Sequence, residues 1–222
     1  MNYNDGTLWF KTNYINNQRY GYYHENHNIN YTTIIYYARK NHFNSMIKHI
    51  LTHHPNYNLK SYMEYHNDIP YKEENYDEDG NLHGIYKEWD SKGNLYMESN
   101  LIHGILNGDH KEYYSNGILK THKTYLNGKL DGITTEYYSS GVIRSQDSYK
   151  YERTHGPQKT FYANGQLCTE IKYIQGKRNG VMKQYTEDGE LMQWRTYKDD
   201  VLVNSKQLKP NLVQEKTTST ND

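Results

Sequence analysis

Residues 108–131 read GDHKEYYSNGILKTHKTYLNGKLD, and this stretch decides the fold because it recurs along the chain. Steps of 24 residues from its first glycine, in both directions, give the glycines Gly84, Gly108, Gly132, Gly156 and Gly180. Nine residues after each stands another glycine: Gly93, Gly117, Gly141, Gly165 and Gly189. Five repeats therefore run from residue 84 to 203 without insertion or deletion, which indicates a repeat architecture.

Three further columns of the repeat are apolar, counting the first glycine as column 0. Column 5 is aromatic: Trp89, Tyr113, Tyr137, Phe161 and Tyr185. Column 11 is aliphatic: Leu95, Leu119, Ile143, Leu167 and Leu191. Column 17 is Leu101, Tyr125, Tyr149, Tyr173 and Tyr197. Short tyrosine-rich segments that end at Asn-Gly predict two strands per repeat, and we expect columns 5, 11 and 17 to share one buried face.

The sequence thus predicts an all-β, elongated antiparallel ribbon of β-hairpin repeats, because a single hairpin is marginal in water and stacked hairpins stabilise one another. The repeats span residues 60–204. Their predicted bounds are 84–107, 108–131, 132–155, 156–179 and 180–203, after a degenerate copy at 60–83. In that copy Lys60 stands in column 0 and Tyr65 in column 5.

The chain ends have weaker patterns. Residues 1–59 are predicted to hold a degenerate hairpin followed by a short helix over about 38–54, which caps the sheet edge. The helix prediction rests on the spacing of Phe43, Met46, Ile47, Ile50 and Leu51, with Pro55 as its stop. Residues 205–222 are polar and are predicted to form a flexible tail.

Composition limits the class of protein. The chain has 222 residues, enough for one or two domains, and only 34% are hydrophobic, so a thick apolar core is not expected. Lys plus Arg and Asp plus Glu number 26 each, which argues against a nucleic-acid partner held by bulk charge. The lone cysteine and the absence of a visible signal peptide favour an intracellular, cytoplasmic protein. No apolar run approaches the roughly 18 residues that a transmembrane segment needs.

The repeat resembles the MORN repeat, in the variant found in YwqK-type antitoxin-like proteins. The pattern is carried by one copy in full: Gly165, Leu167, Glu170, Tyr173, Gly176 and Gly180. Other copies depart from it: His122, Gln146 and Trp194 replace the Glu, and Glu152 and Asp200 replace a Gly. The resemblance implies a ribbon of β-hairpins and a role in protein scaffolding, dimerisation, phospholipid binding or toxin neutralisation.

A candidate interaction stripe is predicted on the face opposite the core. It consists of Tyr114, Tyr138 and Tyr162 in column 6, with Lys87, Lys111, Lys159 and Lys183 in column 3. Exposed aromatic side chains beside lysines suit a protein partner, and less well a phospholipid headgroup. The alternative is that both faces of a thin ribbon are simply rich in tyrosine.

Residues with reactive side chains do not form a catalytic pattern. His42, His49, His53 and His54 crowd the predicted helix, but no Cys or HExxH pattern accompanies them. Cys168 lacks a predicted His and acid partner and is expected to be an exposed or half-buried thiol. We therefore expect no catalytic, cofactor-binding or metal-binding residue, and no enzyme activity.

The expected function is a non-enzymatic scaffold for protein–protein interaction, with homodimerisation as one form of it. Two alternatives stay open: a membrane-surface module that binds phospholipid headgroups, and an antitoxin-like protein that neutralises a partner toxin.

Overall fold

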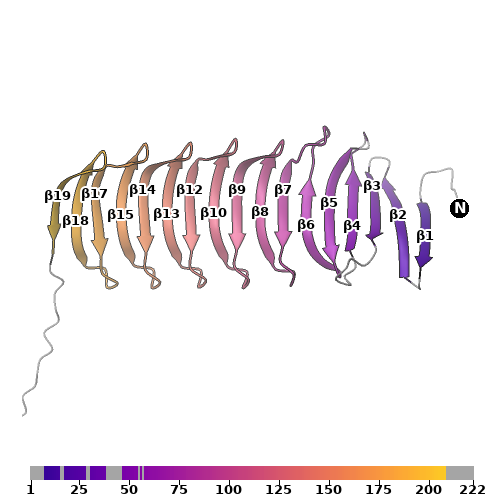
Figure 1. The fold of residues 1–222 in the computed structure, drawn as a ribbon, viewed down its shortest axis with the longest axis horizontal. Coiled ribbons are helices and arrows are strands. Elements are labelled where there is room, and N and C mark those ends of the chain that lie inside the picture. Colours follow the sequence, from indigo (N-terminus) through magenta and orange to yellow (C-terminus); the bar gives the residue numbers. More distant parts are fainter. Residues whose placement is uncertain are drawn as a thin grey trace, which may run out of the picture. The chain divides into compact units, whose positions relative to one another are not determined.

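The computed structural model describes residues 8–15, 18–28, 31–38, 47–54, 56 and 58–208, with side chains from His49 onward. All regular structure in these residues is β-strand, which confirms the all-β prediction (Figure 1). A search of the same residues for a helix able to span a membrane finds none. The chain divides into an N-terminal module, residues 1–132 with 139–141, and a C-terminal module, residues 133–138 with 142–222.

The N-terminal module is an antiparallel meander in which each strand from β1 to β10 pairs with the next, and β10 pairs with β11. Its strands are β1 Leu8–Ile15, β2 Gln18–Asn28, β3 Tyr31–Ala38, β4 Ile47–His53, β5 Leu59–His66, β6 Ile69–Asn75, β7 Gly84–Trp89, β8 Leu95–Ile102, β9 Ile105–Tyr113, β10 Leu119–Leu126 and β11 Lys129–Leu130.

The C-terminal module follows the same plan. Its strands are β12 Gly132–Tyr137, β13 Ile143–Lys150, β14 Arg153–Phe161, β15 Leu167–Ile174, β16 Lys177–Arg178, β17 Gly180–Tyr185, β18 Leu191–Lys198 and β19 Val201–Gln207. Strands β13, β14 and β15 pair in chain order, β15 pairs with both β16 and β17, and β17, β18 and β19 continue the antiparallel order.

Two kinds of turn alternate along the chain. Two-residue turns link one repeat to the next, and both residues of each have positive φ, as in Asn127 (50°) and Gly128 (77°). This is the type I′ geometry, which matches the twist of a hairpin and favours Asn-Gly. Longer turns close each repeat, as where the Tyr114 N–H donates to the Ile118 carbonyl over 2.8 Å.

A β-bulge recurs beside the aromatic column. Tyr113 pairs with Leu119 but Glu112 pairs with Thr121, so Lys120 is the extra residue of the bulge. The same shift occurs after Glu88, Thr160 and Gln184. Columns 5 and 11 pair across each of these hairpins, which confirms the prediction that they share one face of the sheet.

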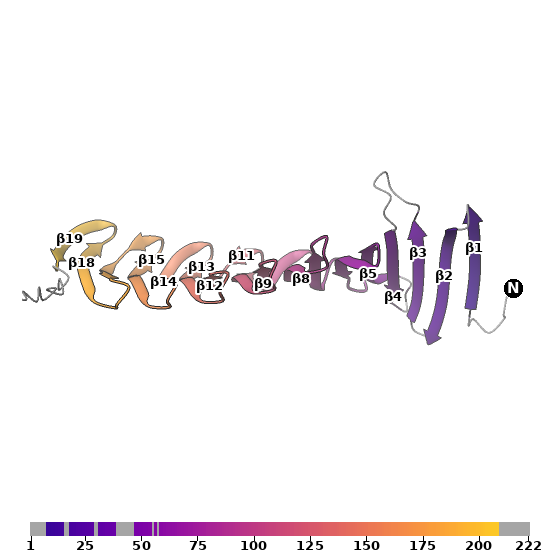
Figure 2. The same cartoon turned by 90° about the horizontal axis from the view of Figure 1, so that it is seen from below.

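The bulge corrects the prediction that column 17 shares their face. Since one extra residue reverses the alternation of side chains, Tyr125 lies on the other face, where its ring meets His110 edge-on at 6.1 Å. Bulges also bend strands, and Figure 2 shows β13, β14 and β15 as arcs, whereas β1 and β2 are straight.

The core is thin, as the composition predicted. Among the described side chains, only Ile171 and Tyr197 are buried hydrophobic residues. Four buried polar residues accompany them: Ser99, Thr121, Thr134 and Thr135. Backbone pairing and cross-strand side-chain contacts therefore contribute much of the order in these sheets.

The predicted helix over 38–54 is wrong where the structure describes it. Ala38 ends β3, and Ile47–His53 is strand β4, which pairs with β3 and β5; residues 39–46 lie outside the described residues. A short apolar run fits either periodicity, and β-branched Ile47, Ile50 and Thr52 favour a strand with neighbours on both sides. Upstream, β1 and β2 form a hairpin where a degenerate one was predicted.

Two other bounds differ from prediction. In the predicted copy at 60–83, Asn67 and Asp68 form a two-residue turn with positive φ, the kind found between repeats, so its register is wrong by half a repeat. Within the predicted tail, residues 205–207 belong to β19 and pair with β18, because pairing satisfies their backbone groups; residues 209–222 lie outside the described part.

Candidate functional site

The tyrosines of the predicted interaction stripe are not an exposed row. Tyr114, Tyr138 and Tyr162 are each half-buried. The Tyr138 hydroxyl donates to the Phe161 carbonyl over 2.8 Å, and the Tyr162 hydroxyl donates to the Tyr185 carbonyl over 2.8 Å. These two hydroxyls tie one repeat to the next, so the predicted exposure is wrong and replacing the rings would disturb the fold.

The lysines of the predicted stripe lie in cross-strand rows with acidic residues. In the N-terminal module the row across β6 to β10 runs Glu73, Lys87, Glu98, Lys111, His122. In the C-terminal module the row across β13 to β18 runs Gln146, Lys159, Glu170, Lys183, Trp194. We call the sheet side that carries these rows the lysine face. It is also the side of the column 5 aromatics, not the opposite face as predicted, because columns 3 and 5 lie two residues apart on one strand.

On the lysine face of the N-terminal module, one carboxylate oxygen serves two donors from the next repeat. Glu98 Oε1 accepts from Lys111 Nζ over 3.2 Å and from the Tyr113 hydroxyl over 2.8 Å. Burial opposes ionisation of Glu98, but the hydrogen bonds from Tyr113 and Lys111 outweigh it and lower its pKa. Burial and the same carboxylate raise the pKa of Tyr113 to about 12.

The C-terminal module repeats this cluster. Glu170 Oε1 accepts from Lys183 Nζ over 3.0 Å and from the Tyr185 hydroxyl over 3.2 Å. The hydrogen bond from Lys183 lowers the pKa of Glu170, and Lys159 adds to that effect. Lys111 and Lys183 are therefore each paired with a glutamate of the preceding repeat rather than presented as unpaired cations.

A pocket opens beside each of these clusters. In the N-terminal module it measures about 140 Å³ and is lined by Ile85, Glu98, Ser99, Asn100, Asp109 and Lys111. In the C-terminal module it measures about 340 Å³ and is lined by Pro157, Glu170, Ile171, Lys172, Val181 and Lys183. The two sets occupy identical repeat columns: 1, 14, 15 and 16 of one repeat, and 1 and 3 of the next.

One carboxyl group of the C-terminal module is poorly satisfied. Burial raises the pKa of Asp147, and a hydrogen bond from Gln158 offsets this only in part. Asp147 Oδ1 and Thr134 Oγ1 are buried without a hydrogen-bond partner among the described residues. A buried carboxylate oxygen without a hydrogen-bond partner costs stability.

Among the described residues, the histidines singled out by the sequence are not part of a group that could hold a metal ion. His49 Nδ1 is bound to the Tyr62 hydroxyl at 2.7 Å, and His54 Nε2 to the Tyr76 carbonyl at 2.8 Å. His42 lies outside the described residues. Cys168 is half-buried, in line with the prediction for its thiol.

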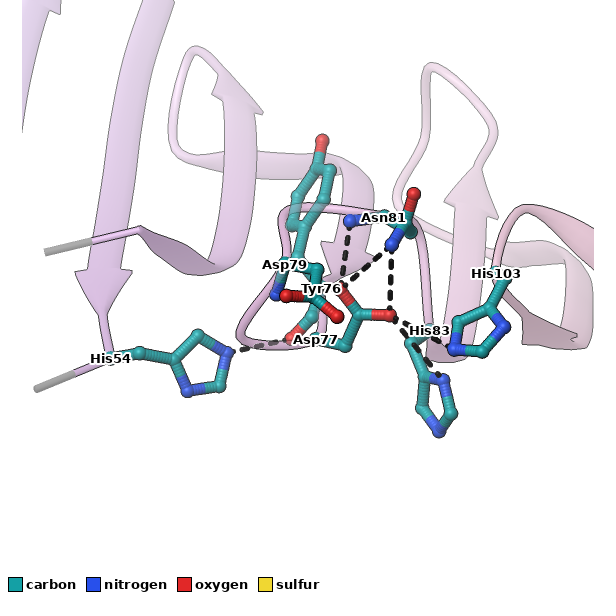
Figure 3. Close-up of polar contacts among 7 residues, drawn as sticks. All are labelled: His54, Tyr76, Asp77, Asp79, Asn81, His83 and His103. Carbon is teal, nitrogen blue, oxygen red and sulfur yellow. Dashed lines mark hydrogen bonds and ion pairs between the residues drawn. The ribbon is translucent and has the colours of Figure 1, made fainter. Parts of the chain in front are cut away.

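A different group could hold a metal ion. Asp77, His83 and His103 bring one ligand atom each within 4.8 Å of one another (Figure 3). Sequence reasoning missed this group. A signal was present, since steps of 24 residues place His83 and His103 in the columns of Asn107 and Asn127, but the wrong register at 60–83 hid the place of Asp77.

Comparison with known families bears on the repeats. A family model described as MORN repeat variant matches five segments: 82–103, 106–127, 130–151, 154–175 and 178–199. A comparison with curated proteins finds no match. The matched segments start two residues before each column 0 identified from the glycines, so the family assignment and the periodicity agree.

Proposed function

Because the chain belongs to the MORN repeat variant family, we propose that it is a non-enzymatic scaffold that binds protein segments at the pockets of its lysine face. The observation that supports this proposal most is the recurrence of one pocket at identical columns in both modules. A pocket built from the same repeat columns gives each module a contact point for a partner segment.

The chemistry of the C-terminal pocket suits an apolar side chain next to polar backbone. Pro157 and Val181 contribute apolar walls, and Val181 is 45% exposed. The Glu170–Lys183 pair adds a fixed acceptor and donor. Buried apolar contact at such a site would supply affinity, and the ion pair would orient the partner.

Membrane-surface binding is the weaker alternative. It relied on a row of free lysines, yet Lys87 lies 3.5 Å from Glu73, Lys111 3.2 Å from Glu98 and Lys183 3.0 Å from Glu170. An anionic lipid would have to compete with these carboxylates. Flotation with vesicles of phosphatidylcholine and phosphatidylserine at low salt tests this alternative, and protein left at the bottom of the gradient rejects it.

The proposal is tested with a matched pair of variants in the C-terminal module. Val181→Glu places a charge in the pocket, whereas Ile174→Glu places it on a residue that is 38% exposed and absent from the pocket lining. We expect proteins enriched from native lysate by the wild type to fall at least tenfold with Val181→Glu and to be unchanged with Ile174→Glu. Direct binding of the purified partner must show the same difference. Equal enrichment by all three proteins would reject the pocket as the binding site.

A further inference from the structure

We propose that Asp77, His83 and His103 form a binding site for a divalent transition-metal ion such as Zn²⁺. Asp77 Oδ2 lies 3.4 Å from His103 Nε2 and 4.0 Å from His83 Nδ1. The two imidazole rings have centroids 5.6 Å apart and planes tilted by 54°. Tetrahedral zinc, with ligands at about 2.0–2.2 Å, holds them roughly 3.3–3.5 Å apart, so small rotations of the side chains would complete the geometry.

The backbone brings these side chains together from two connections: Asp77 and His83 lie between β6 and β7, and His103 lies in the β8–β9 turn. The Asp77 N–H donates to the Asn81 carbonyl over 2.9 Å, and the His83 N–H donates to the Asn75 carbonyl over 2.8 Å. Beside His103, the Gly104 N–H donates to the Leu82 carbonyl over 2.6 Å, which fixes the β8–β9 turn next to His83. The ligand atoms are therefore close because hydrogen-bonded backbone places them there.

Hydrogen bonds orient the Asp77 carboxylate and favour its ionised form. Its Oδ1 accepts the backbone N–H of Asp79 at 3.0 Å and of Asn81 at 2.9 Å. Its Oδ2 accepts from Asn81 Nδ2 at 3.3 Å and points toward the histidines (Figure 3). Partial burial opposes ionisation, but these hydrogen bonds outweigh it and lower the pKa of Asp77. Hydrogen bonds that orient a ligating carboxylate are a regular part of metal sites. His54 takes no part, since its Nε2 is bound to the Tyr76 carbonyl.

Other repeats supply an internal comparison. Where this site has His83 and His103, the next repeat has Asn107, whose Nδ2 donates to Asn127 Oδ1 over 3.0 Å. In the C-terminal module the same columns hold Asn179 and Asp199, 3.4 Å apart. The fold thus needs only a polar pair here, and the first copy alone combines two imidazoles with a carboxylate from the irregular turn after β6.

The donor set indicates the class of ion. Two imidazole nitrogens and one carboxylate oxygen suit zinc and its neighbours in the first transition row rather than calcium or magnesium, which prefer oxygen ligands. His83 and His103 side chains are 45% and 63% exposed, so water can fill the remaining positions. The site would be open, with three protein ligands, and would cross-link the turn after β6 to the β8–β9 turn.

The test uses the full chain after treatment with EDTA, titrated with Zn²⁺ by calorimetry and with Co²⁺ by visible absorption. We expect one equivalent of Zn²⁺ to bind saturably, with a rise in Tm, and Co²⁺ to give the ligand-field bands of a low-symmetry site. His83→Asn, His103→Asn and Asp77→Asn should each weaken Zn²⁺ binding at least tenfold. The two His→Asn changes install the residues of the next repeat, and Asp77→Asn keeps an acceptor for the turn, so folding should persist by circular dichroism.

His122→Asn is the control, because His122 Nε2 pairs with Asp109 at 2.9 Å and the described residues offer no third ligand there. A control is needed because the chain has 12 histidines in all. It should bind Zn²⁺ like the wild type. Absence of saturable one-equivalent binding would overturn the proposal, as would wild-type affinity in His103→Asn or Asp77→Asn, or loss of binding in the control.

Discussion

The pocket beside Glu98 and the pocket beside Glu170 use the same repeat columns, yet they differ in character. Both have a glutamate that holds a lysine and a tyrosine of the following repeat within 3.2 Å. Their walls diverge: Asp109 faces the first pocket where Val181 faces the second. The Glu–Lys–Tyr cluster fixes how successive repeats fit, which leaves the wall residues free to differ between the modules.

The largest difference between the modules is expected at column 0. Gly108 and Gly156 both have positive φ, 103° and 117°. A Cβ at Gly156 would lie 2.9 Å from Ser148 Cβ, whereas at Gly108 the nearest atom, Asn100 Cβ, is 3.4 Å away. We expect Gly156→Ala to lower the free energy of unfolding by about 3 kcal/mol and Gly108→Ala by about 2 kcal/mol. Urea denaturation measures both, and equal losses would mean that backbone strain alone governs this column.

The next effect concerns column 15, which holds Ser99 in one module and Asp147 in the other. Burial raises the pKa of Asp147, so its ionised form costs stability at neutral pH. Asp147→Asn should raise the unfolding free energy at pH 7 by about 1 kcal/mol. Because the pKa of Asp147 is higher in the folded state, the cost of its ionised form disappears as pH falls below the unfolded pKa of 3.8. The Tm values of the wild type and Asp147→Asn should therefore become equal below that pH. A variant less stable than the wild type at pH 7 would contradict the prediction.

A smaller and equal effect is expected at the two glutamates. Glu98→Gln and Glu170→Gln should each cost about 0.5–1 kcal/mol, because the clusters are partly exposed. Both folded pKa values are lowered, so their stabilisation is present above the usual value of 4.5 and is lost as pH falls through the folded pKa. Each Gln variant should therefore show a weaker loss of Tm between pH 5 and pH 3 than the wild type. Unequal costs would show that the clusters are not equivalent.

The smallest stability change is expected from exchanging the pocket walls. Asp109→Val and Val181→Asp each give one pocket the wall residue of the other. Since Val181 is 45% exposed, Val181→Asp should change unfolding by less than about 0.5 kcal/mol, while removing binding at that pocket. Thermal melts and partner titration separate the two outcomes. A large loss of stability would show that the walls support the fold.

The repeat region could be predicted because specific residue types recur with a fixed period. Glycines every 24 positions and Asn-Gly at turns such as Asn127–Gly128 specify hairpins through local backbone preference alone. The prediction that Tyr113 and Leu119 share one face was confirmed by their pairing. The face of column 17 could not be predicted, because the bulge at Lys120 has no sequence signature here. The bulge moves every side chain beyond it on that strand to the opposite face.

The candidate sites were harder to predict because they depend on contacts between repeats. Tyr138 appears exposed by alternation, yet its hydroxyl reaches the Phe161 carbonyl of the next repeat. Lys111 and Glu98 lie 13 residues apart in sequence and meet only through strand register. The helix prediction was wrong at Ile47–His53 for another reason. A short apolar segment does not contain enough residues for its periodicity to distinguish a helix from a strand.

Hydrogen bonds from between-repeat turns to the preceding repeat have a consequence for how this chain can evolve. The Gly104, Gly128 and Gly176 N–H groups donate to the carbonyls of Leu82, Leu106 and Thr154, always 22 residues earlier. Gain or loss of one whole copy by recombination leaves every such bond with an equivalent partner, whereas a length change of any other size misplaces all that follow. The gene can therefore change in copy number by steps of 72 nucleotides, three for each of the 24 residues that separate successive family matches, at little cost to folding.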